Sequence, residues 1–79
     1  MKVSVKLLAI YRSKLPPGTE GNTCEIDLPP GTTFGTALER FKIENDKNSV
    51  ILVNGIAPNP RQELEDGDVL CAFPAIAGG

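Results

Sequence analysis

The hydrophobic positions alternate with polar ones in two segments of the first third of the chain. Residues 2–11 begin with the period of two that is typical of a half-buried strand, and residues 23–28 have the same period. Their apolar positions are Val3, Val5 and Leu7 in the first segment, and Cys24, Ile26 and Leu28 in the second. Leu8 and Ile10 break the first alternation, so either this end of the strand is covered on both faces or these side chains await a partner. The Pro- and Gly-rich residues 12–22 predict an irregular loop between the strands.

One segment has the helical period instead. From about Thr33 to Ile43 the apolar residues follow the spacing of an amphipathic helix, with Thr32 or Thr33 as the N-cap. The residues of this apolar stripe are Phe34, Ala37, Leu38 and Phe41. Gly35 weakens the first turn, so we expect the helix to depend on docking against a sheet.

The second half of the chain predicts three more strands, at residues 49–53, 56–57 and 69–73. The first of them ends at Asn54-Gly55, which is a strong hairpin signal. The middle strand can be only short, because two prolines follow it and interrupt pairing. The predicted order is therefore β-β-α-β-β-β. One helix stripe suffices to cover one face of one sheet, so the fold class is α+β.

Length and charge limit the classes of function. A chain of 79 residues has room for one domain, which we place at residues 1–73, followed by an extended tail at residues 74–79. The net charge of −2 argues against nucleic acid as a partner. No apolar run approaches the length of a transmembrane helix or has the form of a signal peptide. We therefore expect a cytoplasmic protein that has no membrane partner.

The chain lacks the residues of the common catalytic and metal sites. It contains no histidine and only two cysteines, Cys24 and Cys71. A zinc site, a Cys–His nucleophile and a four-cysteine iron–sulfur cluster are all excluded by this count. We expect no bound metal, no permanently bound cofactor and no catalysis by the chain itself. The two cysteines are predicted to be small core or sheet residues.

The C-terminal residues carry the one candidate reactive group, the carboxylate of Gly79. Gly78 and Gly79 lack a Cβ atom, so this end of the chain can enter a passage too narrow for side chains. Pro74 fixes its own φ and favours extended geometry at Phe73, which should direct the tail straight away from the domain. A frayed end is the alternative, but a terminal glycine pair would arise by chance in only about 0.5% of chains.

Several of these features together resemble the ThiS/MoaD family of ubiquitin-like sulfur carriers, which have the β-grasp fold. They are the order of elements, the Val53-Asn54-Gly55 turn, the Leu-Glu-Asp-Gly-Asp sequence at residues 64–68 and the ending at residues 73–79. The resemblance covers essentially the whole chain. It is closer to MoaD, the small subunit of molybdopterin synthase, than to ThiS, although Ala75 stands where MoaD members usually carry a second proline. It implies a mixed sheet of four to five strands in the order 2-1-5-3, with one main helix packed on one face.

The resemblance implies a carrier mechanism. An E1-like enzyme would adenylate the Gly79 carboxylate with ATP, and a persulfide would displace AMP to give a thiocarboxylate. A partner such as a MoaE-like synthase subunit would accept the sulfur. The destination is left open among molybdenum or tungsten cofactor, thiamin, cysteine or homocysteine synthesis, and tRNA thiolation. Two other functions also stay open: a ubiquitin-like modifier joined through Gly79 to lysines, and a β-grasp interaction module with an inert tail.

The family pattern also implies a docking face. It turns Ile51, Val53, Leu70 and Ala72 toward the core and leaves Val50, Leu52, Val69, Cys71 and Phe73 on the open face of the sheet. Exposed apolar patches usually mark interaction sites, so we expect partners to bind this face together with Pro74 and Ile76 of the tail. Phe73 is the expected anchor. The alternative is that residues 12–22 or the tail cover these side chains.

The implied strand order also bears on the two cysteines. It separates Cys24 from Cys71 by one strand, a gap of about 9.6 Å at two strand spacings. A disulfide requires Cα atoms within roughly 7 Å, so we expect no bridge between them.

Overall fold

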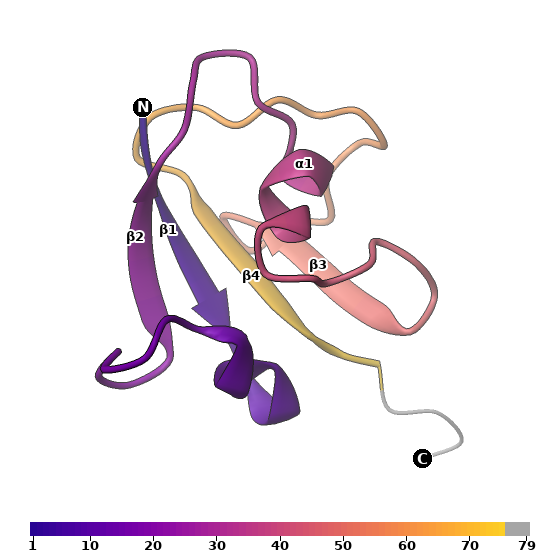
Figure 1. The fold of residues 1–79 in the computed structure, drawn as a ribbon. Helices are drawn as coiled ribbons and strands as arrows, with labels where there is room; N and C mark the ends of the chain where they lie inside the picture. Colours follow the sequence, from indigo (N-terminus) through magenta and orange to yellow (C-terminus); the bar gives the residue numbers. More distant parts are fainter. Residues whose placement is uncertain (76–79) are drawn as a thin grey trace.

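The computed structural model describes residues 1–75, and these residues form a four-stranded mixed sheet with one short α-helix against one face (Figure 1). The elements are β1 (Lys2–Leu7), the 3-10 helix η1 (Ala9–Lys14), β2 (Thr23–Asp27), α1 (Phe34–Glu39), β3 (Ser49–Val53) and β4 (Val69–Pro74). The strand order is β2-β1-β4-β3, with β1 and β4 parallel at the centre and both outer strands antiparallel to their neighbours. The predicted α+β class and the order expected for a β-grasp sheet are confirmed.

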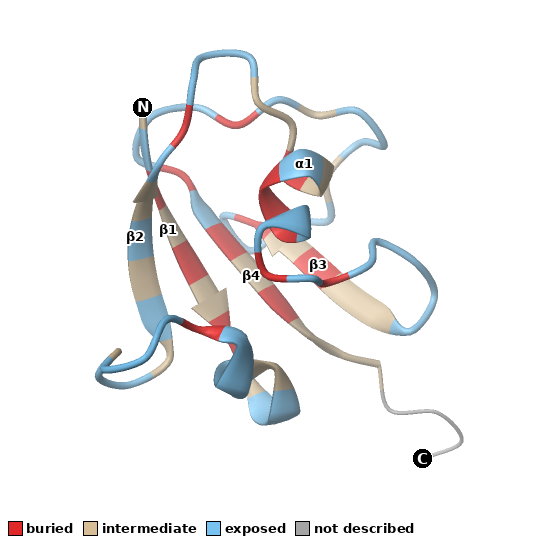
Figure 2. Ribbon diagram, viewed as in Figure 1, coloured by how far each residue is buried: buried red, intermediate tan, exposed pale blue. Residues whose placement is uncertain are grey.

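The hydrophobic core lies between the sheet and α1 (Figure 2). The inward positions of β1, β3 and β4 are buried, as predicted, and they are Val3, Val5, Leu7, Ile51, Val53, Leu70 and Ala72. The helical stripe predicted from the sequence meets them with Phe34, Ala37, Leu38 and Phe41. Cys24 and Ile26 of β2 are half-buried and pack against the edge of this core.

The segment after β1 differs from the prediction. The strand ends at Leu7, and Ala9 has a φ of 54°, so the chain turns into η1 instead of continuing as a strand to residue 11. Ile10 projects into solvent with 75% of its surface exposed, whereas Tyr11 packs against the core. The prediction of an irregular loop from residue 12 is also wrong, because residues 12–14 belong to η1.

The start of α1 agrees with the sequence. Thr33 is the N-cap, and its Oγ1 accepts a hydrogen bond from the Thr36 N–H at 3.3 Å. This bond satisfies one of the N–H groups that the first turn of a helix leaves without a partner.

The end of α1 comes earlier than Ile43, where it was predicted. The α-helix stops at Glu39, and Lys42 has a φ of 58°. The N–H groups of Lys42 and Ile43 donate to the carbonyls of Glu39 and Leu38 at 3.0 and 3.2 Å. These two bonds, with a left-handed residue between helix and loop, are a Schellman motif. The tight turn still places Phe41 in the core, which is why the apolar stripe extends beyond the helix.

The hairpin signal after β3 is confirmed, but the strand predicted after it is not. Asn54 and Gly55 have φ values of 53° and 82°, the positive pair of a two-residue hairpin turn. Val53 and Ile56 close the turn with two backbone hydrogen bonds of 2.8 and 3.1 Å. Their pairing is an isolated bridge, and Ile56 is 71% exposed. The prediction of a strand at residues 56–57 is therefore wrong beyond this one pair.

Candidate functional site

The face of the sheet opposite α1 carries a group of apolar side chains on β3 and β4. The register places Leu52 beside Cys71 and Val50 beside Phe73, and Val69 lies at the start of the same side of β4. Four of these side chains are half-buried, and Val69 is 39% exposed. Because the residues between them are buried under α1, the orientation predicted for both sets is confirmed. We call these five residues the open-face patch.

The other half of the same face is polar. Two rows cross the sheet from β4 through β1 to β2, and they read Cys71–Lys6–Thr23 and Val69–Ser4–Glu25. An apolar centre beside a charged and polar border is the usual anatomy of a protein-binding surface.

Leu8 extends the open-face patch, although the sequence did not assign it to a site. Leu7 pairs with Ala72, and the Leu8 N–H donates to the Ala72 carbonyl at 3.1 Å. The register carried one residue further therefore places the half-buried Leu8 beside Phe73. The signal was present in the sequence, because Leu8 falls on the polar side of the β1 alternation.

The helix η1, at the start of the segment that follows β1, does not cover the patch. Tyr11 and Leu15 pack against the core residues, and the Lys14 Nζ donates to the carbonyl of Lys42, which follows α1. These contacts place η1 on the α1 side of the sheet, where it closes one end of the core (Figure 1). The open-face patch lies on the other side.

The root of the C-terminal tail, Pro74 and Ala75, is held within the described residues by Ser49 of β3 and by Asn48, which precedes β3. The Ala75 N–H donates to the Asn48 carbonyl at 2.9 Å, so the nitrogen of Pro74 faces away from β3 and toward the side of β1. On that side the bond from Leu8 to Ala72 is the last one found. Because proline has no N–H, Pro74 cannot donate a bond toward β1, but this costs no bond to β3. The pairing of β4 with β1 ends at this position.

The structure brings some of the predicted site residues together and separates others. The open-face patch is contiguous, and Phe73 lies next to the tail root. Pro74 pairs with Ser49, and it alternates with Phe73 along β4, so it lies on the α1 side of the sheet. Ile76, Gly78, Gly79 and the predicted straight exit of the tail lie outside the described residues.

The two cysteines are neutral thiols at neutral pH. Burial raises the pKa of Cys24 and of Cys71 above the ordinary value of 9.0, and the nearby cations Arg40 and Lys6 lower each pKa by a smaller amount. Both are free, as predicted. They lie two strands apart and face opposite sides of the sheet, because Cys24 pairs with the buried Val5 and Cys71 pairs with Lys6. Cys71 therefore serves as a small apolar member of the open-face patch.

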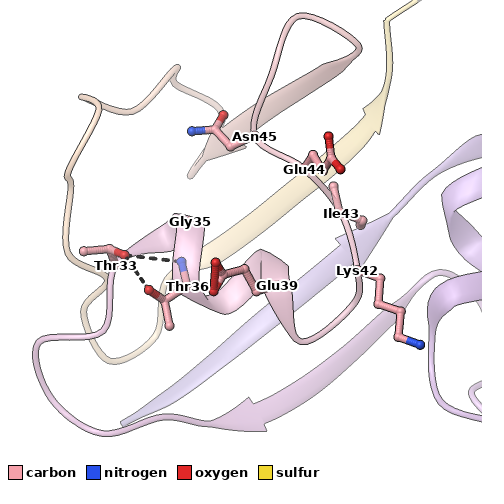
Figure 3. Close-up of a pocket in the computed structure, with 8 residues that line it drawn as sticks. All are labelled: Thr33, Gly35, Thr36, Glu39, Lys42, Ile43, Glu44 and Asn45. Atoms are coloured by element: carbon pink, nitrogen blue, oxygen red, sulfur yellow. Dashed lines mark hydrogen bonds between the residues drawn. The ribbon is translucent and has the colours of Figure 1, made fainter.

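A shallow hollow lies on the α1 side of the molecule (Figure 3). Its lining residues come from α1 with its N-cap and from the segment after the helix, and they are Thr33, Gly35, Thr36, Glu39, Lys42, Ile43, Glu44 and Asn45. The hydroxyls of Thr33 and Thr36 bond to each other at 3.1 Å, which satisfies part of the polar lining. None of the predicted site residues lines this hollow, so the candidate site is the open-face patch with the tail root.

Residues 1–75 contain neither a metal-binding cluster nor a membrane-spanning helix that would add to this site. No group of three His, Cys, Asp or Glu side chains is placed to hold a metal ion in this part of the chain. No helix within it is long and apolar enough to cross a membrane.

Comparison with known proteins gives one family and several solved structures. The model of the ThiS family matches residues 5–79. The chain is similar to a putative molybdopterin converting factor, subunit 1, from Pyrococcus furiosus, with 30% identity and a TM-score of 0.74 over 95% of this chain and 98% of that one. It is also similar to SAMP1 from Haloferax volcanii, with 24% identity and a TM-score of 0.77 over 100% of both chains. At 24% identity, the second similarity shows the fold alone. No curated protein matches the sequence.

Proposed function

Because this chain belongs to the ThiS family, we propose that it is a sulfur carrier whose Gly79 carboxylate is converted to a thiocarboxylate. The observation that carries the proposal is the extent of the family match, which runs through the terminal Gly78-Gly79 pair to the last residue. The 30% identity with a protein named as a molybdopterin converting factor subunit supports molybdopterin synthesis as the destination of the sulfur.

The chemistry begins with activation of the tail. A terminal carboxyl group has a pKa of about 3.5 and is ionised at neutral pH, so it is a poor electrophile. An E1-like enzyme joins the Gly79 carboxylate to the AMP portion of ATP and releases pyrophosphate. A persulfide then displaces AMP, and a thiol reduces the resulting acyl disulfide to the thiocarboxylate. The partners supply the catalytic groups, and this chain supplies docking and reach.

Docking is the proposed role of the open-face patch. Its apolar side chains lie beside the tail root, so a partner bound there is next to the reactive end of the chain. Phe73 is the proposed anchor, because it is the large aromatic side chain nearest to the root. Both the E1-like enzyme and a MoaE-like sulfur acceptor are proposed to use this surface in turn.

The tail root limits how far the carboxylate can reach. The last described backbone bond is the one from Ala75 to Asn48, and four residues (79 − 75) follow Ala75. Four extended residues span at most about 14 Å. The reaction centre of each partner must therefore lie within about that distance of the root when the partner is docked.

The proposal is tested by loading the protein with sulfur in vitro. The protein is incubated with an E1-like enzyme of this family, ATP, a persulfide donor and a thiol reductant, and its intact mass is then measured. We expect one oxygen to be replaced by one sulfur, and we expect no change in a control variant that lacks Gly79. No ATP-dependent change of any kind in the wild-type protein would overturn the proposal and favour a plain interaction module.

A second candidate is a ubiquitin-like protein modifier. The terminal Gly78-Gly79 pair would serve this function equally well. A solved structure of the same fold is named small archaeal modifier protein 1, with 22% identity and a TM-score of 0.75 over 95% of this chain and 98% of that one, and this similarity shows the fold alone. The first step would be the same adenylation of Gly79. Conjugates linked to lysine that survive reduction on a denaturing gel of the native host would favour the modifier.

A further inference from the structure

A hydrogen bond between two distant segments ties η1 to the strand that borders the tail root. The Tyr11 Oη and the Ser49 Oγ lie 2.6 Å apart, although 38 residues separate them in the sequence. Ser49 pairs with Pro74, one residue before the last described backbone bond of the tail. The Tyr11 hydroxyl is thus linked to the tail root through the side chain of Ser49.

The tail root is also held by the turn that precedes β3. The Asn48 carbonyl accepts the Ala75 N–H, and the Asn48 N–H donates to the Asp46 Oδ1 at 2.8 Å. The Ser49 N–H donates to the Asp46 carbonyl at 3.1 Å. Asp46 therefore shapes the turn that carries Asn48, the acceptor for the Ala75 N–H. Tyr11 holds Ser49, which is the first residue after that turn.

The Tyr11 ring is held independently of its hydroxyl. The ring is half-buried and packs against the core, and the Lys14 Nζ lies 5.9 Å from its centroid. Removal of the hydroxyl alone should therefore leave the ring and η1 in place.

We propose that Tyr11 is a positioning residue that fixes where and in which direction the C-terminal tail leaves the sheet. Its hydroxyl holds Ser49, which keeps the Asn48 carbonyl in register with Ala75. A carboxylate at the end of four residues reaches a reactive geometry more often when the root of those residues is fixed. The open-face patch lies on the opposite side of the sheet, so docking does not depend on this hydroxyl. The inference rests on the proposed carrier function.

The test compares Tyr11→Phe, Ser49→Ala and the double variant in steady-state adenylation by the E1-like enzyme. We expect kcat to fall about two- to five-fold, while the KM for the carrier stays unchanged. The upper value corresponds to a hydrogen bond of about 1 kcal/mol. The double variant should lose no more than either single variant, because both changes remove the same bond. The matched control is Thr19→Val, which removes a 2.6 Å hydroxyl bond to Pro16 in the loop after η1 and should change neither constant.

A second measurement does not depend on the function. Amide hydrogen exchange at Ala75 should become about five-fold faster in Tyr11→Phe, while exchange at Leu70 in the middle of β4 stays unchanged. Unchanged exchange at Ala75, or a raised KM with the wild-type kcat, would overturn the inference. If the wild-type protein were not adenylated at all, the proposed function would fail, and exchange at Ala75 would still decide whether Tyr11 holds the tail root.

Discussion

Asn54 locks the end of β3 to the start of β4, at the end of the sheet far from the tail root. Its Nδ2 donates to the Asp68 Oδ1 at 2.9 Å, and its Oδ1 accepts the Val69 N–H at 2.9 Å. Asn54 also has a φ of 53°, which asparagine tolerates better than most residues with a side chain. Replacement of Asn54 therefore tests both the hydrogen bonds and the backbone conformation.

The expected cost follows from these contacts. Asn54→Ala removes a bond to a backbone N–H, worth about 1 kcal/mol, and a bond to a carboxylate, worth about 1.5–3 kcal/mol. It also places an alanine in the left-handed region, at a cost of about 1 kcal/mol. Asn54 is exposed, so water replaces part of what is lost. We expect the free energy of unfolding to fall by about 2–4 kcal/mol, a large part of the roughly 5–15 kcal/mol typical of a whole domain.

Urea unfolding of Asn54→Ala and Asn54→Gly separates the two contributions. Glycine accepts the positive φ, so Asn54→Gly should lose mainly the hydrogen bonds and be about 1 kcal/mol more stable than Asn54→Ala. Asn45→Ala, which changes an exposed asparagine outside this turn, is the control. An Asn54→Gly variant as stable as the wild type would refute the role of the bonds. Equal stability of the two Asn54 variants would refute the backbone argument.

Further predictions concern the tail, the anchor and the thiols. Phe73→Ala should weaken binding to both the activating enzyme and the sulfur acceptor about ten-fold or more in calorimetry, and normal binding to both would contradict its role as an anchor. Gly78→Ala should leave thermal unfolding unchanged but slow adenylation, because a Cβ widens the tail; unchanged rates would remove the argument for a narrow passage. Deletion of Gly79 should abolish sulfur loading in mass spectra at unchanged stability. Burial raises the pKa of Cys24 and Cys71 above 9.0 in the folded state, so their contribution to stability is present below pH 9.0 and is lost as the pH rises through the folded pKa values. Unfolding measured between about pH 8 and 10 should show a smaller loss of stability in a variant with both cysteines changed to alanine, and an equal loss in both proteins would contradict the assignment.

The strands could be predicted because burial on one face leaves a period of two in the sequence. The same local signal failed after Leu7, where Leu8, Ile10 and Tyr11 look like a continuing strand. The positive φ of Ala9 ends the strand there, and Tyr11 finds its partner 38 residues away. No local pattern can show a contact of that kind.

The end of α1 shows a second limit of the sequence. Left-handed residues after helices are usually glycine or asparagine, and here the position is occupied by Lys42. Nothing in the sequence marked this residue as the end of the helix. The apolar stripe continued to Phe41 and made the helix look longer than it is.

The candidate site was predictable to the extent that it follows from alternation. The register turns the open-face patch outward and its neighbours inward, as the sequence and the family resemblance indicated. The tail root was not predictable, because it depends on the backbone carbonyl of Asn48, and a carbonyl has no signature in the sequence. The position of Pro74 on the α1 side follows from the same register.

The parallel pairing of β1 with β4 makes completion of the sheet depend on a late segment of the chain. β4 lies between β1 and β3 in the sheet, and its residues 69–74 come after nearly all the other residues that the structure describes. The pair of β1 and β2 can form early, but β3 pairs with β4 in the described sheet and therefore stays unpaired until β4 is available. A translation product that stops before β4 would expose unpaired apolar strands, which are prone to aggregation. One late segment therefore both completes the sheet and carries the tail root.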